Sequence, residues 1–319
     1  MPELPEVETI ARSLRGTHDL AISRSAHPNG PLGVLGRKFA DVQVAWQRSI
    51  AEPAAAAFCM RLYGQSILEI TRRGKFLVFQ LEKDWMLIHL RMSGDLRVEP
   101  RDKTTLGLHD RIIFNFADDA RMVFNDTRKF GRAWLLKDPQ QVLGTLGPEP
   151  FDPELTADAF HSMLHKKKRA IKPLLMDQKF LAGMGNIYTD EALHLARVHP
   201  LEKASSLNYS QAESLLRAIR EVLTEGIRRN GASIDWAYRG GDSRITSGCI
   251  SAMARNAPCA ATKSNESWSA SGGLIFVHLA SRWKKAKKHY CRVIALFTFS
   301  LDNDGVIVFL FFTGLISRC

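Results

Sequence analysis

The chain has 319 residues, 45% of them hydrophobic, which is enough apolar material for two or more folded cores. Its 44 Lys and Arg residues against 33 Asp and Glu residues give a net charge of +11 and a pI of about 9.6, so we expect a polyanionic partner such as nucleic acid. A basic soluble protein without such a partner is the alternative. Five scattered Cys residues argue against a disulfide scaffold, and the acidic N-terminus argues against a signal peptide, so we expect a reducing cytoplasm.

The first predicted element is a helix over residues 2–16. Its apolar residues recur at helical spacing, and they are Val7, Ile10, Ala11 and Leu14. Gly16 follows the last of them and is predicted to end the helix. Pro2 and Glu3 fit this interpretation, because Pro favours the first helical turn and an acidic side chain there complements the helix dipole.

The same N-terminus also suggests chemistry. Removal of Met1 leaves Pro2 with a free secondary amine, and an α-amino group titrates near neutral pH, with a pKa of about 7.7–8.0. A neutral amine can attack the C1′ atom of a sugar to give an iminium ion, which is the electron sink that covalent amine catalysis needs. Glu3 and Glu6 lie close enough in sequence to transfer protons at a glycosidic bond. Both interpretations can hold together, since a helix start fixes the amine in space.

Short strands separated by Gly and Asp turns are predicted between residues 38 and 136, and they indicate an antiparallel sandwich or barrel. The predicted strands are Ser66–Thr71, Phe76–Leu81, Met86–Arg91, Arg111–Phe116 and Arg121–Phe124. A stretch rich in Gly and Pro over residues 144–153 is predicted to be a linker. The expected fold class is α+β, with an N-terminal helix and β-sandwich domain over residues 1–143.

Residues 154–242 carry helical patterns and form the second predicted domain. The predicted helices are Ala157–Lys167, Ile171–Met176, Ile187–Leu195 and Ser210–Asn230. Ser210, with Glu213 three residues further on, is predicted to form a capping box at the start of the last helix. Residues 243–319 are expected to be an irregular tail.

Three short motifs in the β-rich region combine turns with cationic and apolar residues. Lys75 ends the run Arg-Arg-Gly-Lys between two predicted strands, so its side chain can project from a turn. Met92 lies in Leu-Arg-Met-Ser-Gly, and Arg128 and Phe130 lie in Asp-Thr-Arg-Lys-Phe-Gly. Taken alone, a turn lysine is also compatible with simple solvation, and Met92 and Phe130 with core packing.

A basic run precedes a Gly-rich turn in the helical region. The run His-Lys-Lys-Lys-Arg-Ala-Ile-Lys covers residues 165–172, and Gly-Met-Gly-Asn follows at residues 183–186. Gly lets a backbone approach closely, and a helix N-terminus offers free N–H groups to a phosphate. We therefore expect Asn186 both to cap a helix and to contact a phosphate. The basic run is also typical of a solvated face.

Together these motifs resemble the bacterial formamidopyrimidine-DNA glycosylase family, from the run Pro-Glu-Leu-Pro-Glu-Val-Glu at residues 2–8 to about Asp242. The resemblance implies a helix–two-turn–helix domain after the sandwich. It also implies a bifunctional DNA glycosylase and AP lyase that removes oxidised purines from double-stranded DNA and then cleaves the strand. The implied protein is a monomer of the bacterial cytoplasm, with no cofactor in its chemistry and no membrane partner.

The resemblance implies a role for each residue of the motifs. Pro2 would form a Schiff base with the sugar, and Glu3 would donate a proton to the sugar ring or the leaving base. Glu6 would support the site, and Lys75 would assist β-elimination. The implied DNA contacts are Met92, His109, Arg128, Phe130, Lys168, Lys172 and Asn186.

Three of these contacts would fill the space that a flipped-out nucleotide leaves in the duplex. Met92 and Phe130 supply apolar wedges, and Arg128 supplies a guanidinium, so together they can replace lost stacking and base-edge hydrogen bonds. Lys168 and Lys172 would contact phosphates. His109 would touch DNA as well, although an isolated His is more often structural.

The resemblance stops after Tyr-Arg-Gly-Gly-Asp, which ends at Asp242. The family continues with a zinc finger that holds Zn²⁺ through two Cys-x2-Cys pairs, whereas Cys249 and Cys259 are too far apart to form one. We therefore expect no metal ligands and no structural Zn²⁺. Codons exist for residues 243–281 that, read one nucleotide out of frame, spell both pairs and then a stop. The tail is thus predicted to be frameshifted sequence, with a natural divergent tail as the alternative.

Two other classes of function stay open. A missing finger favours a DNA-binding protein whose catalysis is lost or impaired. A non-enzymatic RNA- or ribosome-binding protein is the third class, since helix–two-turn–helix units occur there too. Pro2, Glu3 and Lys75 argue against it, because a protein that only binds needs none of them.

Overall fold

The computed structural model describes most of the chain up to residue 231 and two short segments beyond it. The described residues are 1–16, 33–101, 106–231, 296–301 and 307–312. The chain divides into two units, Met1–Cys249 and Ile250–Cys319. Among the described residues, no helix is long and apolar enough to cross a membrane.

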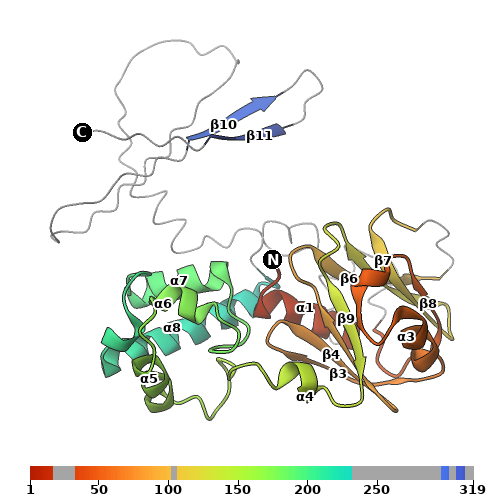
Figure 1. Ribbon diagram of the computed structural model, residues 1–319, viewed down its shortest axis with the longest axis horizontal. Coiled ribbons are helices and arrows are strands. Elements are labelled where there is room, and N and C mark those ends of the chain that lie inside the picture. Colours follow the sequence, from red (N-terminus) through yellow and green to blue (C-terminus); the bar gives the residue numbers. More distant parts are fainter. Residues whose placement is uncertain (17–32, 102–105, 232–295, 302–306, 313–319) are drawn as a thin grey trace. The chain divides into compact units, whose positions relative to one another are not determined.

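Two β-sheets make up the N-terminal part of the first unit (Figure 1). One contains β1 (Phe39–Val44), β6 (Gly94–Pro100), β7 (Asp110–Phe116) and β8 (Ala120–Asp126). The other contains β2 (Ile50–Glu52), β3 (Ile67–Arg73), β4 (Phe76–Leu81), β5 (Trp85–His89) and β9 (Arg132–Leu136). The strand orders are β1-β7-β8-β6 and β2-β9-β5-β4-β3. All pairs are antiparallel except β2 with β9, so the predicted antiparallel sandwich departs from expectation at one short edge strand.

The sandwich core lies between the two sheets and is dominated by aromatic rings. Its largest fully buried side chains are Phe39, Phe58, Phe79, Phe114, Phe116 and Phe124. Strand β4 alternates as a strand buried on both faces must. Leu77 and Phe79 enter this core, whereas Phe76 and Val78 pack on the other face with Leu143 of helix α4 (Gln140–Leu143). Helix α3 (Ala55–Leu62) packs against β1 and β2.

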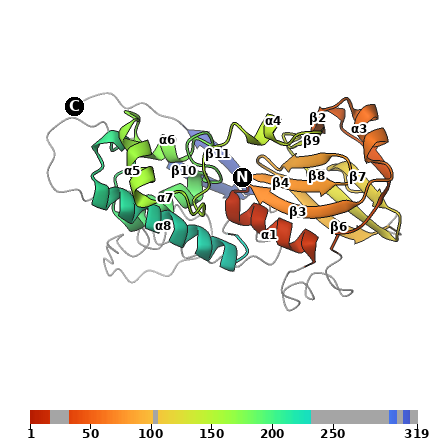
Figure 2. The same cartoon turned by 90° about the horizontal axis from the view of Figure 1, so that it is seen from below.

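Helix α1 (Leu4–Arg15) contributes to two cores and ends as predicted at Gly16, whose φ of 75° is left-handed. Its predicted start at Pro2 is wrong by two residues, because Glu3 has an extended backbone and is the N-cap. Val7, Ile10, Ala11 and Leu14 pack into the sandwich. Leu4 packs into the helical core instead, and its N–H donates to the carbonyl of Gly183 over 3.0 Å. Figure 2 shows α1 running beside β3, and its residues also contact helix α8 (Tyr209–Arg228). Burial of one such aliphatic side chain is worth about 1.5–3 kcal/mol, so α1 holds the N-terminus firmly between both parts.

Four helices follow the linker region, close to the predicted bounds. They are α5 (Ala157–His165), α6 (Ile171–Leu175), α7 (Asn186–Ala196) and α8. Turns fill the chain between α6 and α7, as a helix–two-turn–helix unit requires. The predicted capping box of Ser210 with Glu213 is wrong by two residues. Asn208 caps α8 with Gln211, because its Oδ1 accepts the N–H of Gln211 over 2.9 Å.

The second unit contains one described pair of antiparallel strands, β10 (Leu296–Leu301) and β11 (Ile307–Phe312). Both runs are rich in Phe, Leu, Ile and Val, which favour strands, so they pair within a tail that was expected to be irregular. The predicted reading-frame shift at Ser243 and the cysteines at 249 and 259 lie outside the described residues.

Candidate active site and DNA-contact residues

The carboxylate of Glu3 lies at the N-terminus of α7. Its Oε1 accepts the N–H of Ile187 over 2.9 Å, and its Oε2 accepts the N–H of Tyr188 over 3.4 Å. These N–H groups have no partner within their own helix, and the positive end of the helix dipole favours a carboxylate. The predicted cap is therefore wrong: Gly185 is the N-cap of α7 and Asn186 its first residue, because Glu3 from a distant part of the chain satisfies the helix end.

Two glycines of the turn before α7 make room for the N-terminal segment. A Cβ atom at Gly185 would lie 2.5 Å from Oε1 and 2.7 Å from Cγ of Glu3. A Cβ atom at Gly183 would lie 2.9 Å from Cβ of Leu4, and the φ of 99° at Gly183 is one that side-chain-bearing residues rarely adopt. The Gly-rich turn does allow a close approach, by a carboxylate of the protein itself, and the predicted contact with a phosphate stays a prediction.

Glu6 ties the first turn of α1 to α7. Its Oε2 accepts the N–H of Glu3 over 2.9 Å, and its Oε1 accepts the hydroxyl of Tyr188 over 3.0 Å. Glu6 is 1% exposed and Glu3 is 2% exposed, so both carboxylates are held away from bulk water. The structure therefore brings the two predicted acids together in one buried site. Tyr188, which sequence reasoning did not single out, orients the second of them.

Lys75 joins this site from the turn between β3 and β4. Gly74, with a φ of 57°, forms the turn, and Lys75 is 4% exposed. Burial lowers the pKa of Lys75, while the charges of Glu3 and Glu6 act in the opposite direction. Burial raises the pKa of Glu3, and the positive charge of Lys75 offsets part of that effect. Opposed shifts of this kind suit a site that moves protons, and the interpretation of Lys75 as a merely solvated turn lysine is wrong.

Pro2 is buried next to these groups, whereas Met1 is 41% exposed. With Met1 attached, the Pro2 nitrogen is an amide and has no nucleophilic lone pair. Removal of the exposed Met1 gives Pro2 the free amine, flanked by Glu3.

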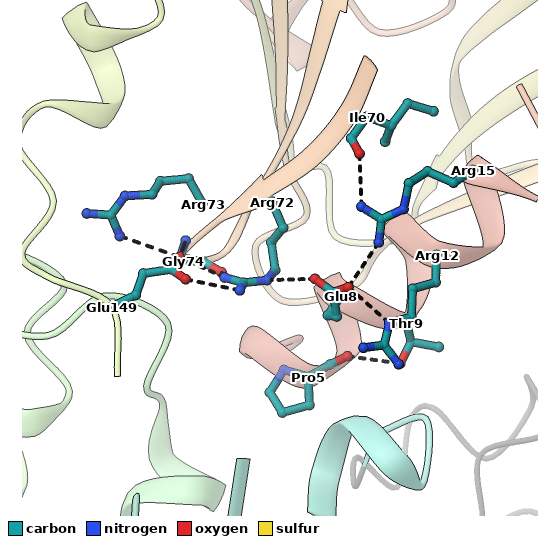
Figure 3. Close-up of polar contacts among 10 residues, drawn as sticks. All are labelled: Pro5, Glu8, Thr9, Arg12, Arg15, Ile70, Arg72, Arg73, Gly74 and Glu149. Carbon is teal, nitrogen blue, oxygen red and sulfur yellow. Dashed lines mark hydrogen bonds and ion pairs between the residues drawn. The ribbon is translucent and has the colours of Figure 1, made fainter. Parts of the chain in front are cut away.

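An ion-pair network fixes the turn that carries Lys75 (Figure 3). Arg72 donates to Oε1 and Oε2 of Glu149 over 2.7 and 3.0 Å, and its Nε donates to Glu8 over 3.2 Å. Glu149 also accepts the N–H of Gly74. Glu8 in turn accepts from two arginines of its own helix, Arg12 and Arg15. The turn is thus joined both to α1 and to the segment before α5, which sequence reasoning did not reveal because the partners are 64 and 77 residues apart.

We expect Glu149→Ala to destabilise the protein and to misplace Lys75. The variant removes a bidentate Arg72 pair with side chains 9% and 16% exposed and leaves the N–H of Gly74 without this acceptor. A loss of about 2–3 kcal/mol in the free energy of unfolding is expected, together with slower strand cleavage at an abasic site. Urea denaturation and a single-turnover cleavage assay measure the two effects. Glu154→Ala, an exposed acid further along the same segment, is the matched control and is expected to change neither.

Met92, Arg128 and Phe130 form an exposed group at the ends of the sandwich strands. Met92 is 43% exposed and Phe130 is 52% exposed, so the alternative of core packing is wrong for both. The guanidinium of Arg128 lies 3.5 Å from the sulfur of Met92, so two different loops meet here. The thioether and the guanidinium lie beside one another and the exposed ring of Phe130 follows two residues after Arg128, so the loops offer the kinds of contact that a gap in a base stack would require.

Two histidines lie near this group. His109 is half-buried, and its Nδ1 lies 3.2 Å from a guanidinium nitrogen of Arg111. His89 at the end of β5 was missed by sequence reasoning. Its Nδ1 accepts the N–H of Arg91 over 3.0 Å, and burial together with the charges of Arg91 and Lys75 lowers its pKa to about 3. His89 is therefore neutral at ordinary pH and fixes the backbone just before Met92.

The three predicted phosphate contacts of the helical part are all accessible, but they differ in their partners. Lys168 is exposed in the connection between α5 and α6, and Asn186 is exposed at the start of α7. Lys172 is half-buried on α6 and forms an ion pair with Asp190 of α7, with Nζ 2.8 Å from Oδ1. Lys172 is thus already neutralised in part within the protein.

No group of three or more His, Cys, Asp or Glu residues within the described part of the chain could hold a metal ion. Cys59 is the one cysteine that this part contains, and it is a free thiol. The fold and site together define a class of protein in which a β-sandwich with an N-terminal acid pair and a buried lysine is joined to a helix–two-turn–helix unit.

Comparison with known proteins identifies the family. Residues 1–133 match the family model described as the formamidopyrimidine-DNA glycosylase N-terminal domain, and residues 146–237 match the formamidopyrimidine-DNA glycosylase H2TH domain. The chain is 37% identical over 235 residues to the formamidopyrimidine-DNA glycosylase of Protochlamydia amoebophila, which covers 73% of the chain and 79% of that protein. It is 39% identical over 238 residues to the enzyme of Enterococcus faecalis, again over 73% of the chain and 79% of the relative. The chain therefore belongs to the formamidopyrimidine-DNA glycosylase family.

Solved structures agree with this assignment. The Lactococcus lactis formamidopyrimidine-DNA glycosylase, bound non-covalently to DNA containing an AP site, is 33% identical with a TM-score of 0.63, over 72% of this chain and 83% of that one. The same enzyme in complex with DNA containing FAPY-dG is 32% identical with a TM-score of 0.64, over 73% and 82% of the two chains.

Proposed function

We propose that this chain is a base-excision-repair DNA glycosylase and AP lyase that removes oxidised purines, such as 8-oxoguanine and formamidopyrimidines, from double-stranded DNA. The observation that carries the proposal is the buried group of Pro2, Glu3, Glu6 and Lys75. It is drawn from the N-terminal segment, the first turn of α1 and the β3–β4 turn, and its Glu3 caps α7. A buried carboxylate with a raised pKa lies beside the amine that removal of Met1 would expose, so one site can supply both an acid and a nucleophile.

The reaction follows from these groups. The nitrogen of Pro2 forms a bond to C1′ as the bond between C1′ and the base breaks, and Glu3 gives its proton to the sugar ring oxygen or the departing base. Ring opening and loss of the nitrogen's proton leave an iminium ion at C1′. This ion acidifies C2′, and loss of a C2′ proton then expels the 3′ phosphate. Burial lowers the pKa of Lys75, which favours the neutral amine that can accept this proton.

Borohydride trapping tests the proposal directly. Borohydride reduces an iminium ion to a stable amine, so protein lacking Met1 should become covalently joined to duplex DNA that contains 8-oxoguanine. Pro2→Gly should trap far less, and protein that retains Met1 should not trap, as mass spectrometry of the cross-linked fraction can show. Absence of any trapped product with protein lacking Met1 would exclude the Schiff-base mechanism.

Two other functions are disfavoured by the same group of residues. A DNA-binding protein with lost catalysis would have no use for a lysine and two acids held together in a buried site, and neither would an RNA- or ribosome-binding protein. A nicking assay on duplex DNA with 8-oxoguanine separates the enzyme from both.

The helical part supplies the DNA backbone contacts in this proposal, and salt dependence tests them. Lys168→Ala should reduce the slope of log K against log salt by about 0.9, the value for one phosphate on B-DNA. Sequence alone predicts a reduction of the slope of about the same size for Lys172→Ala. Because Lys172 is already paired with Asp190, its contact with a phosphate would release fewer counterions, so we expect a smaller reduction of the slope. Arg128→Ala should change discrimination of the base opposite the lesion more than it changes the slope.

Fluorescence anisotropy over a range of KCl concentrations measures these slopes. Lys83→Ala is the matched control, because Lys83 is an exposed lysine in the β4–β5 turn, at the opposite end of β4 from Lys75. Slopes that are equal for wild type, Lys168→Ala and Lys83→Ala would contradict the proposed phosphate contact.

We propose that residues 243–319 are out-of-frame sequence in place of the family's zinc finger, and that the working domains are 1–143 and 154–242, joined by 144–153. The family matches end at residue 237, before Ser243, which supports this division. We also propose that the protein is a monomer and that its reaction needs no cofactor. The relatives come from bacteria, and we place the protein in the cytoplasm, where bacterial DNA lies.

Metal analysis tests the proposed loss of the finger. A tetrahedral structural site needs four ligands at close spacing, and this sequence has no Cys-x2-Cys pair, so purified protein is expected to hold less than stoichiometric Zn²⁺. Restoring the reading frame at codon 243 should restore one tightly bound Zn²⁺ per chain and strengthen lesion binding. One tightly bound Zn²⁺ in the unaltered chain would contradict the proposal.

A further inference from the structure

Three loops of the sandwich carry its proposed DNA contacts. They are the Met92 loop (residues 90–93), the His109 loop (107–109) and the Phe130 loop (127–131). Although distant in sequence, all three are bonded to one residue, Asp126, which ends β8 and is fully buried. Burying a carboxylate costs free energy unless its oxygens accept hydrogen bonds, so the groups that bond to Asp126 show which parts of the chain it holds in place.

Asp126 uses its side chain and its backbone to bind the three loops. Oδ1 accepts the hydroxyl of Ser93 over 2.5 Å and the N–H of Arg128 over 3.1 Å, which joins the Met92 loop to the Phe130 loop. Oδ2 accepts the N–H of Gly131 over 2.7 Å at the other end of the Phe130 loop. Its own N–H donates to the carbonyl of His109 over 2.9 Å. One residue therefore holds each of the loops at a fixed separation from the others.

Arg111 extends this connection. Its Nε donates to the carbonyl of Asp126 over 2.7 Å, and its other nitrogens reach the carbonyl of Leu108 and the ring of His109. Arg132 completes the Phe130 loop, because one of its nitrogens donates to the carbonyls of residues 129–131. The backbones of the loops that would touch DNA are thus held by the guanidinium groups of Arg111 and Arg132 as well as by Asp126.

Both wedge residues follow a residue whose backbone is left-handed. Arg91, with a φ of 55°, precedes Met92, and Lys129, with a φ of 60°, precedes Phe130. Side-chain-bearing residues keep such a conformation only where the surrounding structure imposes it. Bonds to Asp126 flank Lys129 and Phe130 on both sides, at Arg128 and Gly131, and the bond from Ser93 follows Met92 directly.

We propose that Asp126 is a positioning residue that fixes Met92, Arg128 and Phe130 relative to one another and thereby determines how the enzyme discriminates the base opposite the lesion. This inference rests on the proposed glycosylase function. Asp126 does not touch DNA itself. Its carboxylate sets the distance between the two loops that enter the gap left by the flipped nucleotide, so the pairing partner of the damaged base meets a rigid surface.

Asp126→Asn is the informative variant, because it keeps the size of the side chain. One oxygen can still accept from Ser93 and Arg128, but an amide NH₂ then faces the N–H of Gly131, where two donors repel. Single-turnover excision of 8-oxoguanine opposite C and opposite A gives the discrimination ratio. We expect Asp126→Asn to reduce this ratio by roughly tenfold, the size of effect that one buried hydrogen bond to a charged group carries.

Two further measurements separate positioning from general destabilisation. In the Arg128→Ala background, Asp126→Asn should lower the ratio less than it does in wild type, because the part of its effect that passes through the Arg128 side chain is already lost. 2-Aminopurine placed opposite an abasic site should show a weaker fluorescence change on binding to Asp126→Asn than to wild type. Glu99→Gln is the matched control, because Glu99 is a buried acid of the same sheet that bonds strand residues Arg97 and Arg121. It should lower the melting temperature and leave the ratio unchanged.

The outcomes separate this inference from the proposed function. Wild-type protein that fails to trap with borohydride refutes the function, whatever Asp126 does. Wild-type protein that traps, with an unchanged ratio in Asp126→Asn, overturns the positioning role. If Asp126→Asn does not fold, Ser93→Ala serves instead, because it breaks only the bonds that the Ser93 hydroxyl makes between the Met92 and Phe130 loops. It should reduce the ratio less, and an unchanged ratio in that variant also overturns the role.

Discussion

Glu3→Gln is expected to abolish base excision while DNA affinity stays close to that of wild type. The amide keeps the shape of the side chain but has no proton to give, and loss of a general acid costs about 10²–10⁴-fold in rate. Glu3 is 2% exposed at the N-terminus of α7, and glutamine keeps its size, so the contacts that the rest of the protein makes with the duplex stay unchanged. Single-turnover excision of 8-oxoguanine and anisotropy with an abasic-site duplex measure the two quantities. Full excision by Glu3→Gln would show that another group supplies the proton.

The pKa of Glu3 adds a second, independent expectation. Burial raises this pKa above its ordinary value of 4.5, so the folded protein binds the proton more tightly than the unfolded chain does. The stability that Glu3 contributes is therefore complete below about pH 4.5 and is lost as the pH rises through the folded pKa. Gln mimics the protonated acid, so Glu3→Gln should melt at the same temperature as wild type or higher at neutral pH. The difference should disappear in acid.

Sequence predicts the elements of this protein where the pattern is local. The α1 helix with its stop at Gly16, the five strands named beforehand and the four helices of the second part all follow from periodicity. Helix α3 lies in the region that was predicted to consist of short strands, and of the strands that were not named, β6 and β2 have weak local signals. Strand β6 starts with Gly94, ends with Pro100 and carries charged residues on one face, and β2 is only three residues long. These two strands form because they pair with β9 and β8, and not because their own residues favour a strand.

The site shows the same division between local and distant information. Pro2, Glu3, Glu6 and Lys75 were identifiable by motif and by resemblance, and the structure places them together. What sequence could not provide is how they are held, because these contacts join residues far apart in the chain. The cap that Glu3 gives to α7 spans 184 residues, and it displaced the cap predicted from the local Gly-Asn sequence.

Gly185→Ala is expected to reduce excision by about 100-fold with little change in DNA binding. The φ of −135° at Gly185 is accessible to alanine, so the backbone itself imposes no strain. The difficulty is steric: the new Cβ would lie 2.5 Å from Oε1 and 2.7 Å from Cγ of Glu3, so the carboxylate must leave the N–H of Ile187. A displacement of about 1 Å in a catalytic group is enough for a loss of this size.

Two comparisons test whether Gly185 acts through Glu3. In the double variant Glu3→Gln/Gly185→Ala, the excision rate should equal that of Glu3→Gln alone, since the acid that alanine displaces is already absent. Gly183→Ala should behave differently, because its φ of 99° is strained for alanine and its Cβ would collide with Leu4 of the helical core. That variant should lower the melting temperature by several degrees, whereas Gly185→Ala should act mainly on the rate. Wild-type excision by Gly185→Ala would mean that Glu3 performs its chemistry from a position other than the N-terminus of α7.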